Sequence, residues 1–344
     1  MIYTDLYLND LKKNNFDINQ LIYSNICISG GTGLIGSYLI DYLLSNLKYK
    51  GKIFALVRNV DIARSRFNLF NSDERLVLLP YDMKSPIRID DKIDFVVHAA
   101  SLTDPINYSK FPVETMKVNI FGLTYLLDFC ASKNSRFLFL SSCEVYGENN
   151  HENLKENDYG FIDILNPRAS YNEAKRCCET YCAAYKNEYN IDVKVLRLSR
   201  VYGPTMKMTD SKALSQFIKN SLRKENIVLK SLGNQLFNYT YVSDVIGAII
   251  RVLSTKDNSD LNISFNFSNT ELHSLKEISN FIASLSGTKV IFENPTSLEK
   301  AGYSKSIVSS MDCSLFKKIF GFSAEISIFE GIKRTLDVLR SQNF

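Results

Sequence analysis

Three side chains in this sequence, Ser142, Tyr171 and Lys175, have the types and spacing needed for proton transfer to or from a hydroxyl group. Ser142 lies 29 positions before Tyr171, and Lys175 lies four positions after it. Residues four apart share one face of a helix, so a helical segment here places the Lys175 ammonium group beside the Tyr171 phenol. A neighbouring ammonium group lowers the pKa of a phenol, which is about 10 when unperturbed. The sequence thus predicts Tyr171 as the acid or base, with Lys175 lowering its pKa and Ser142 bonding the substrate oxygen.

A glycine-rich segment upstream supports this interpretation. The apolar run 26–28 leads into Gly30, Gly33 and Gly36, and a helical apolar pattern follows directly. A strand, a tight turn and a helix in this order form a mononucleotide-binding unit, in which the pyrophosphate lies at the positive N-terminal end of the helix. Gly30 and Gly33 allow the chain to turn close to the pyrophosphate, and Gly36 allows the helix and the strand to pack closely.

The elements around these motifs predict an α/β fold. Strands rich in Val, Ile, Leu or Phe are expected at 52–57, 76–79, 95–99, 136–140 and 193–198, and helices at 36–47, 113–132 and 171–189. Short buried strands that alternate with helices are typical of a Rossmann-type, doubly wound parallel sheet.

The predicted organisation has three parts. Residues 1–24 form a polar, partly helical lead-in, residues 25–203 the dinucleotide-binding domain, and residues 204–344 mainly a smaller, mixed α/β lobe that binds substrate. The boundary is placed at Gly203-Pro204, where the alternation of strands and helices loosens. Helices are expected in the lobe near 211–223, 244–253 and 274–286.

Composition argues against several other classes of protein. The chain has 344 residues, 45% of them hydrophobic, and a formal net charge of +4. It contains no Lys- and Arg-rich run, so no nucleic-acid partner is expected. No signal peptide and no apolar run of membrane-spanning length is present, so no membrane partner is expected either. Seven scattered cysteines without a Cys-x-x-Cys pair, together with three histidines, predict no metal site and a reducing, cytoplasmic location.

Taken together, the motifs resemble the extended short-chain dehydrogenase/reductase family, and within it the nucleotide-sugar epimerases, dehydratases and decarboxylases. The matching pieces follow the family's order over residues 22–330: 30–36, 81–82, 98–100, 118–122, 141–147, 171–175, 202–204 and 241–244. The segment from Asn166 to Glu179 most resembles UDP-glucuronate decarboxylases, as does Glu144, two residues after the Ser142 hydroxyl.

The resemblance implies roles for individual positions. Asp82 contacts adenine, Ala99 and Ala100 line the nicotinamide side, Asn119 supports the site through a helix, and Lys175 also binds the nicotinamide ribose. The full set of predicted cofactor-binding residues is Gly30, Thr32, Gly33, Leu34, Ile35, Gly36, Arg58, Asp82, Met83, Ala99, Ala100, Asn119, Tyr171 and Lys175. The predicted catalytic residues are Ser142, Tyr171, Lys175 and Glu144, where Glu144 either transfers protons or fixes the loop.

The predicted substrate-binding residues are Ser142, Arg168, Arg200 and Lys207, the last three toward substrate phosphate. Some positions depart from the family's pattern. Phe237 stands where many relatives have an arginine that binds the diphosphate or assists decarboxylation, which argues against decarboxylation here. Arg200 replaces the usual asparagine, and Thr205 the usual arginine, around the Tyr-Gly-Pro turn. Because a guanidinium group binds phosphate bidentately, Arg200 is a candidate to take over anion binding.

Arg58 bears on the choice of cofactor. It lies at the end of the second expected strand, where an acidic residue favours NAD and an arginine accommodates the 2′-phosphate of NADP. NADP is therefore favoured, with NAD as the alternative if Arg58 is only a solvated surface charge.

Three functions remain open. The resemblance implies a redox-neutral nucleotide-sugar enzyme, which oxidises the sugar C4 with tightly bound NAD(P)+ and later returns the hydride. A second possibility is a 4-dehydrogenase or 4-keto reductase with net redox, and a third is a non-catalytic dinucleotide sensor. The resemblance also implies a homodimer, in which helices 113–132 and 171–189 form a four-helix bundle with the partner.

Overall fold

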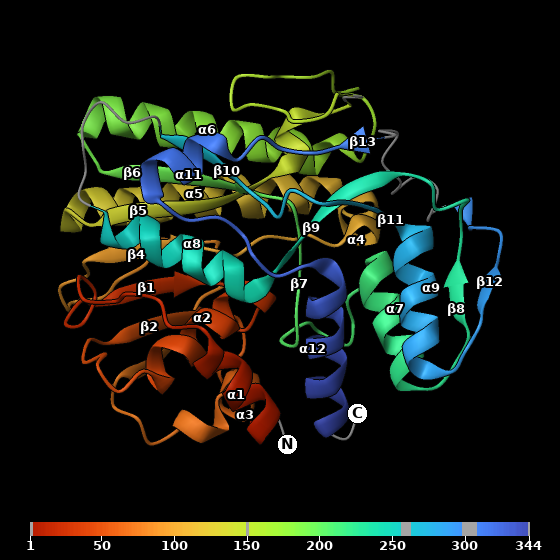
Figure 1. The fold of residues 1–344 in the computed structure, drawn as a ribbon. Helices are drawn as coiled ribbons and strands as arrows, with labels where there is room; N and C mark the ends of the chain where they lie inside the picture. Colours follow the sequence, from red (N-terminus) through yellow and green to blue (C-terminus); the bar gives the residue numbers. More distant parts are fainter. Residues whose placement is uncertain (1–2, 149–150, 256–262, 298–307, 343–344) are drawn as a thin grey trace.

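A seven-stranded parallel sheet forms the centre of the protein. The computed structural model describes residues 3–148, 151–255, 263–297 and 308–342 (Figure 1). The strand order is β10-β6-β5-β4-β1-β2-β3, and every neighbouring pair is parallel. The strands are β1 (Ile26–Ser29), β2 (Ile53–Val57), β3 (Leu76–Pro80), β4 (Phe95–His98), β5 (Arg136–Ser142), β6 (Val193–Leu198) and β10 (Ser264–Phe267).

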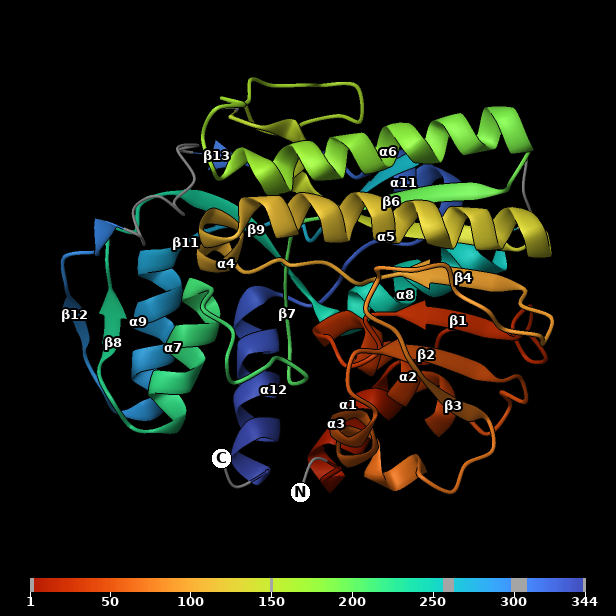
Figure 2. The same ribbon diagram turned by 180° about the vertical axis from the view of Figure 1, so that it is seen from behind.

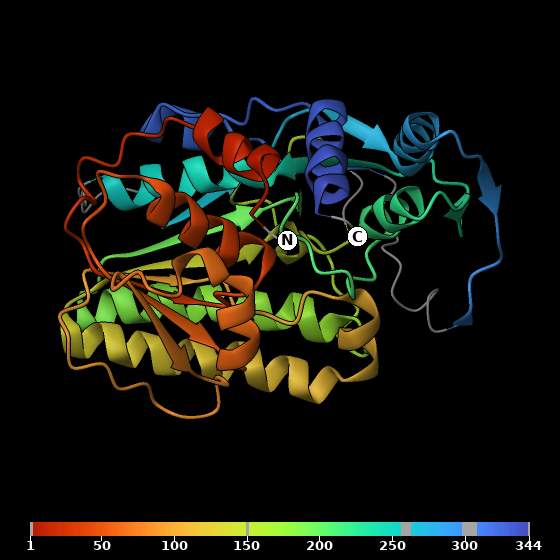
Figure 3. The same cartoon turned by 90° about the horizontal axis from the view of Figure 1, so that it is seen from below.

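Helices cover both faces of this sheet because its strands are apolar on both sides. In β1, Ile26 and Ile28 belong to one buried cluster, while Cys27 points to the other. The first cluster includes residues of α2 (Leu34–Ser45), α3 (Val60–Arg66), α8 (Val242–Ser254) and α11 (Ser314–Phe320). The opposite face is covered by α5 (Pro112–Lys133) and α6 (Ala169–Tyr189), with the short α4 (Pro105–Lys110) beside them (Figures 2 and 3). This is the doubly wound arrangement that the sequence predicts.

A smaller lobe lies beyond one end of the sheet. Strand β9 (Leu236–Tyr241) pairs with β7 (Arg200–Tyr202) and β13 (Val308–Ser309) in parallel, and with β11 (Leu272–Ser274) antiparallel. The short strands β8 (Ile227–Leu229) and β12 (Val290–Phe292) form a separate parallel pair. Among the described residues, the lobe also contains the helices α7 (Ala213–Leu222), α9 (Leu275–Ser286) and α12 (Ile328–Ser341).

The chain returns from the lobe to the large sheet after residue 203. Helix α8 packs on the sheet, and β10 extends it next to β6. Part of the segment 204–344 therefore belongs structurally to the large sheet, so that segment is not a separate unit throughout. None of the helices within the described ranges is long and apolar enough to cross a membrane.

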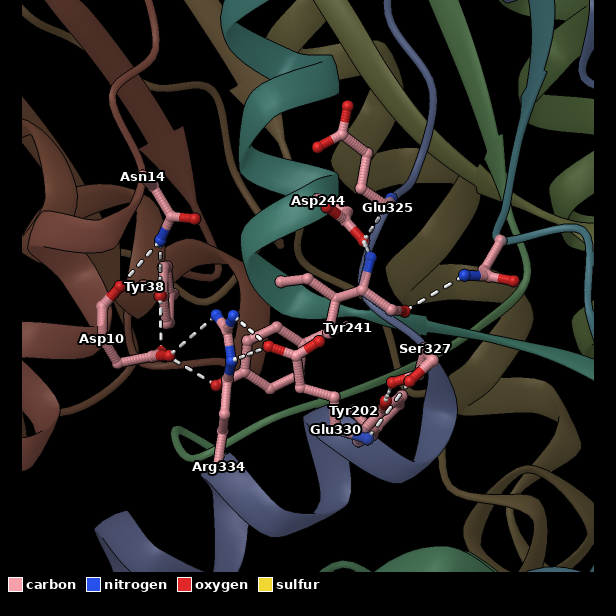
Figure 4. A network of polar contacts seen from close by, with 12 residues as sticks. Asp10, Asn14, Tyr38, Tyr202, Tyr241, Asp244, Glu325, Ser327, Glu330 and Arg334 are labelled. Carbon is pink, nitrogen blue, oxygen red and sulfur yellow. Dashed lines mark hydrogen bonds and ion pairs between the residues drawn. The ribbon is translucent and has the colours of Figure 1, made fainter.

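The N-terminal segment is tied to both parts. Helix α1 (Asp5–Lys13) contributes Asp10, whose Oδ2 accepts hydrogen bonds from the hydroxyls of Tyr38 and Tyr241, each at 2.8 Å (Figure 4). Arg334 of α12 lies 3.5 Å from the other oxygen of the same carboxylate. A buried carboxylate needs such partners, so this network holds α1, α2, β9 and α12 together.

Candidate active site

The turn between β1 and α2 has the shape that a dinucleotide requires. Gly30 has a φ of +73°, and a Cβ there would lie 2.9 Å from the Cα of Ala100, so the position requires glycine. A Cβ at Gly36 would overlap the carbonyl oxygen of Gly30. No side chain caps the first turn of α2, so its backbone N–H groups suit an anion. These features fit the pyrophosphate of NAD(P) at the N-terminus of α2.

The other residues predicted to bind the cofactor follow the same edge of the sheet. Around the first strand, Thr32 lies in the glycine turn, Gly33 is the N-cap of α2, and Leu34 and Ile35 begin that helix. The remaining residues come directly after the next strands: Arg58 after β2, Asp82 and Met83 after β3, and Ala99 and Ala100 after β4. The carboxyl ends of parallel strands meet at one edge, where open α/β sheets bind their ligands.

Asn119 supports this edge from α5. It is buried, and its Oδ1 accepts a hydrogen bond of 2.7 Å from the Ser101 hydroxyl, while its Nδ2 donates to the Thr115 carbonyl. Asn119 therefore anchors α5 to the segment that follows β4, in agreement with an indirect, supporting role.

The Ser142, Tyr171 and Lys175 side chains, called the Ser–Tyr–Lys trio below, meet at the end of β5. Ser142 is the last residue of β5, and Tyr171 and Lys175 occupy the first two turns of α6. The Lys175 Nζ donates to the Leu140 carbonyl at 2.9 Å and lies 5.9 Å from the centroid of the Tyr171 ring. The Ser142 Oγ accepts the Glu144 N–H at 3.2 Å, and the Ser142 hydroxyl also hydrogen-bonds the Tyr171 phenol.

Burial opposes the predicted effect of Lys175 on Tyr171. Tyr171 is buried, and burial raises its pKa; hydrogen bonding to Ser142 lowers it, and the Glu144 charge raises it further. Lys175 is not among the main groups that shift this pKa. Burial lowers the pKa of Lys175 itself to about 8. In the protein alone, loss of hydration disfavours the charged forms of both side chains. That Lys175 lowers the Tyr171 pKa stays a prediction.

Glu144 and Arg168 form an ion pair beside the trio. Their Oε2 and Nη2 atoms lie 2.9 Å apart, and Asn172 donates to the same oxygen at 3.1 Å. Burial raises the pKa of Glu144, but the Arg168 and Arg200 charges and the Asn172 hydrogen bond outweigh it, so the net shift is downward. Glu144 is thus a carboxylate near neutral pH. Its catalytic role stays a prediction, and an ionised Glu144 favours a base over an acid.

Comparison with known proteins identifies the family. A model of the NAD dependent epimerase/dehydratase family matches residues 26–267. The chain belongs to this family. Among its relatives, UDP-glucuronic acid decarboxylase 5 of Arabidopsis thaliana is 32% identical over 69% of this chain and 69% of its own length. UDP-glucuronic acid decarboxylase 1 of Xenopus tropicalis is 28% identical over 92% of this chain and 72% of its own.

Solved structures of the epimerase/dehydratase family share the fold. UDP-glucuronic acid 4-epimerase from Bacillus cereus, in complex with UDP-glucuronic acid and NAD, superposes with a TM-score of 0.78; it is 22% identical, and the match covers 93% of this chain and 100% of that one. The dTDP-glucose 4,6-dehydratase DesIV from Streptomyces venezuelae, with NAD bound, gives 0.79 at 20% identity, covering 93% and 98%. The predicted family and the predicted fold are confirmed.

Tyr108 is a member of the site that the epimerase/dehydratase motifs do not reveal. Its buried ring stacks on the Tyr171 ring, with centroids 5.1 Å apart and an interplanar angle of 13°. The Ser170 hydroxyl donates to the Tyr108 carbonyl at 3.2 Å, which ties α4 to α6. Tyr108 lies on a short helix outside every motif, so the only signal was its position just after the fourth strand.

The predicted phosphate-binding cations lie in different places. Arg200 of β7 stacks on Phe237, with its Cζ 3.5 Å from the ring centroid, and its charge acts on Glu144. Lys207 is exposed. Partial desolvation and then the Arg58 charge lower its pKa, which indicates that it lies near Arg58 instead. The Thr205 hydroxyl donates to the Leu34 carbonyl at 2.7 Å, so this segment reaches the start of α2. Arg168 and Arg200 thus belong to the Glu144 side, and Lys207 to the cofactor side.

Proposed function

We propose that this family member is a redox-neutral enzyme that oxidises the C4 hydroxyl of a nucleotide sugar and later reduces the 4-keto sugar again. The observation that carries the proposal is the position of the Ser–Tyr–Lys trio. It lies at the carboxyl edge of the sheet, where the glycine turn and the uncapped start of α2 fit a dinucleotide. Residues that transfer a proton and residues that fit a hydride-accepting cofactor therefore share one edge.

In this proposal Tyr171 takes the proton of the C4 hydroxyl, and Ser142 donates a hydrogen bond to the same oxygen. Bound NAD(P)+ supplies the hydride acceptor and a positive charge at the site. Because burial raises the pKa of Tyr171 in the protein alone, we expect the phenolate to form only when positive charge is added. Lys175 donates to the Leu140 carbonyl, 5.9 Å from the centroid of the Tyr171 ring, and in this proposal it also binds the nicotinamide ribose.

The relatives are named for UDP-glucuronic acid, which supports a uridine diphosphate sugar as the first compound to test. The 4-keto group makes its neighbours acidic or labile, and epimerisation, dehydration and decarboxylation all begin with this oxidation at C4. Phe237, in place of an arginine, argues against decarboxylation. In this proposal Arg168 binds substrate phosphate, and its ion pair with Glu144 holds it beside the trio.

The choice of NADP over NAD rests on Arg58 and Lys207. Two neighbouring cations, at the end of β2 and beside the start of α2, suit a 2′-phosphate. The structural relatives above were solved with NAD, so NADP is a specific proposal for this chain. The same two cations favour the second candidate function, an NADP(H)-dependent 4-dehydrogenase or 4-keto reductase with net redox.

A homodimer is part of the proposal. Large apolar side chains are exposed along α5 and α6, among them Val113, Met116, Phe121, Tyr181 and Tyr189. Such a surface suits a four-helix bundle formed with a second copy. All seven cysteines are free, which supports a reducing, cytoplasmic location. Sedimentation of the purified protein tests the dimer, and a concentration-independent monomer would contradict it.

One experiment tests the function and the cofactor together. The protein is purified without added cofactor and denatured, and the released nucleotides are identified by mass spectrometry. We expect NADP, since a recycled cofactor stays bound through purification. Released NAD would contradict the assignment of Arg58 and Lys207 but keep the redox-neutral function. A protein that carries no nucleotide would favour the second candidate.

A further inference from the structure

Arg200 presents its guanidinium group on an aromatic surface, and its charge acts on Glu144 beside the trio. It pairs with Tyr239 in the parallel ladder of β7 and β9, and Phe237 lies two residues earlier on the same face of β9. Both aromatic side chains are buried, whereas Arg200 is half-buried. With its Cζ 3.5 Å from the Phe237 centroid, the guanidinium stacks on the ring, and this contact fixes its plane while leaving its edge free to bind.

The charges around Arg200 are unbalanced. Glu144, the nearby carboxylate, is already bound by Arg168 at 2.9 Å and by Asn172. Within the described part of the chain, no hydrogen bond or ion pair involves the Arg200 guanidinium. One carboxylate therefore faces two guanidinium groups. A half-buried cation that must share its counter-ion is costly to desolvate. Guanidinium N–H groups that make no hydrogen bond to the described residues can bind a carboxylate or phosphate bidentately.

We propose that Arg200, held in place by Phe237, binds an anionic group of the substrate next to Tyr171. The inference rests on the proposed function and names one feature of its substrate. It also explains two departures from the family's pattern at once: this chain lacks the arginine on β9, where Phe237 stands, and carries a guanidinium on the neighbouring strand β7. The anionic group is either a carboxylate on the sugar or the diphosphate, and the ligands below distinguish these sources.

The test measures binding by calorimetry with the cofactor-loaded protein and three ligands: UDP-glucuronic acid, UDP-glucose and UDP. Arg200→Gln should weaken binding of at least one ligand by about tenfold or more, because a charge-assisted bidentate contact is lost. A loss confined to UDP-glucuronic acid assigns the anion to the sugar carboxylate. An equal loss for all three assigns it to the diphosphate.

Three variants serve as controls. Arg200→Lys keeps the positive charge but not the planar guanidinium group with its paired N–H donors, and should recover only part of the affinity. Phe237→Leu keeps the apolar volume but removes the ring face, and should weaken binding by roughly two- to fivefold. Arg223→Gln removes an exposed arginine that pairs with Glu225, and should leave all affinities unchanged. Bound cofactor, measured by absorbance, reports whether each variant is folded.

Two results would overturn the proposal. If Arg200→Gln binds all three ligands within twofold of the unmodified protein, Arg200 does not recognise the substrate, while the proposed function stands. If the unmodified protein binds none of the three ligands, the proposed substrate class fails, and this inference fails with it.

Discussion

The cofactor edge and the Glu144 side of the site are built in different ways. At the cofactor edge, backbone geometry dominates: Gly30 is fixed by its positive φ and its approach to Ala100, and the first turn of α2 is left uncapped by any side chain. On the Glu144 side, charged and aromatic side chains dominate: Glu144 pairs with Arg168, and Arg200 stacks on Phe237.

This difference bears on where the chain departs from the family's pattern. The glycine turn keeps the pattern, whereas Arg200 and Phe237 depart from it on the Glu144 side, and Arg58 departs from it at the cofactor edge. A backbone turn that must approach a pyrophosphate tolerates few residue types. A side-chain cluster can present a cation from either of two neighbouring strands. Here the guanidinium group is on β7, at Arg200, while β9 carries Phe237. We infer that the cofactor chemistry is common to the family and that the substrate is particular to this chain.

The largest expected effect is the loss of turnover in Tyr171→Phe. In the proposed mechanism Tyr171 takes the sugar proton, so without the phenol the rate should fall by about 10³-fold, while cofactor content stays unchanged. Tyr185→Phe is the matched control, because Tyr185 lies on the same helix and donates to Asp128 instead. Turnover retained in Tyr171→Phe would remove Tyr171 from the mechanism.

Gly30→Ala tests the cofactor edge. Both its φ of +73° and its 2.9 Å approach to Ala100 oppose a Cβ, so cofactor affinity should fall by roughly tenfold or more. Gly287→Ala is the control for backbone strain alone, since Gly287 has a φ of +68° but no atom within 4 Å of a Cβ built there. It should lower the melting temperature slightly and leave cofactor binding intact. Equal cofactor affinity in both variants would contradict the assignment of the turn.

Tyr108 tests how the aromatic neighbour positions Tyr171. Tyr108→Leu removes the stacked ring and should lower kcat by up to about tenfold with little change in KM, because an aromatic pair contributes about 0.5–1.5 kcal/mol. Tyr108→Phe keeps the stack and should retain most of kcat. If Tyr108→Phe is as slow as Tyr108→Leu, the hydroxyl acts and the stacked ring does not.

The smallest expected effect is on stability, and it concerns the pH dependence that the Lys175 side chain causes. Burial lowers its pKa from 10.5 to about 8, so between these values the unfolded chain binds more protons than the folded one. The stability of the cofactor-free protein therefore rises with pH in that window. Lys175→Met should raise the melting temperature at pH ~7 and have less effect near pH ~10, while abolishing turnover. Exposed Lys117→Met is the control, and a pH-independent difference would contradict the burial argument.

The strands β1 to β6 and the helices α2, α5, α6 and α8 could be predicted because each is a compact apolar run or a clear helical pattern. The short helices α3, α4 and α11 were not predicted. Strand β10 was not predicted, since its Ser264–Phe267 run alternates polar and aromatic residues and is very short. The polar Asn266 of this strand is buried, and it accepts a hydrogen bond of 2.6 Å from the buried Tyr146 hydroxyl. Nothing in the sequence alone indicated that the chain would return to the sheet at this point.

In the site, the four-residue spacing correctly predicted that Lys175 and Tyr171 share one face of a helix. It did not show how strongly burial would desolvate the two side chains. The stacking of Tyr108 on Tyr171, and of Arg200 on Phe237, joins segments distant in the chain. Such contacts depend on how α4, α6, β7 and β9 pack, and local patterns carry no information about it.

The central claim is that the enzyme removes a hydride from the sugar and returns it. The most direct measurement follows the absorbance band of reduced nicotinamide after UDP-glucuronic acid, UDP-glucose or a thymidine diphosphate sugar is mixed with the cofactor-loaded protein. We predict a transient rise that decays as product forms, with no net reduced cofactor, and no rise at all in Tyr171→Phe. Steady accumulation or consumption of reduced cofactor would contradict the redox-neutral account, and no change with any of these sugars would contradict catalysis on them.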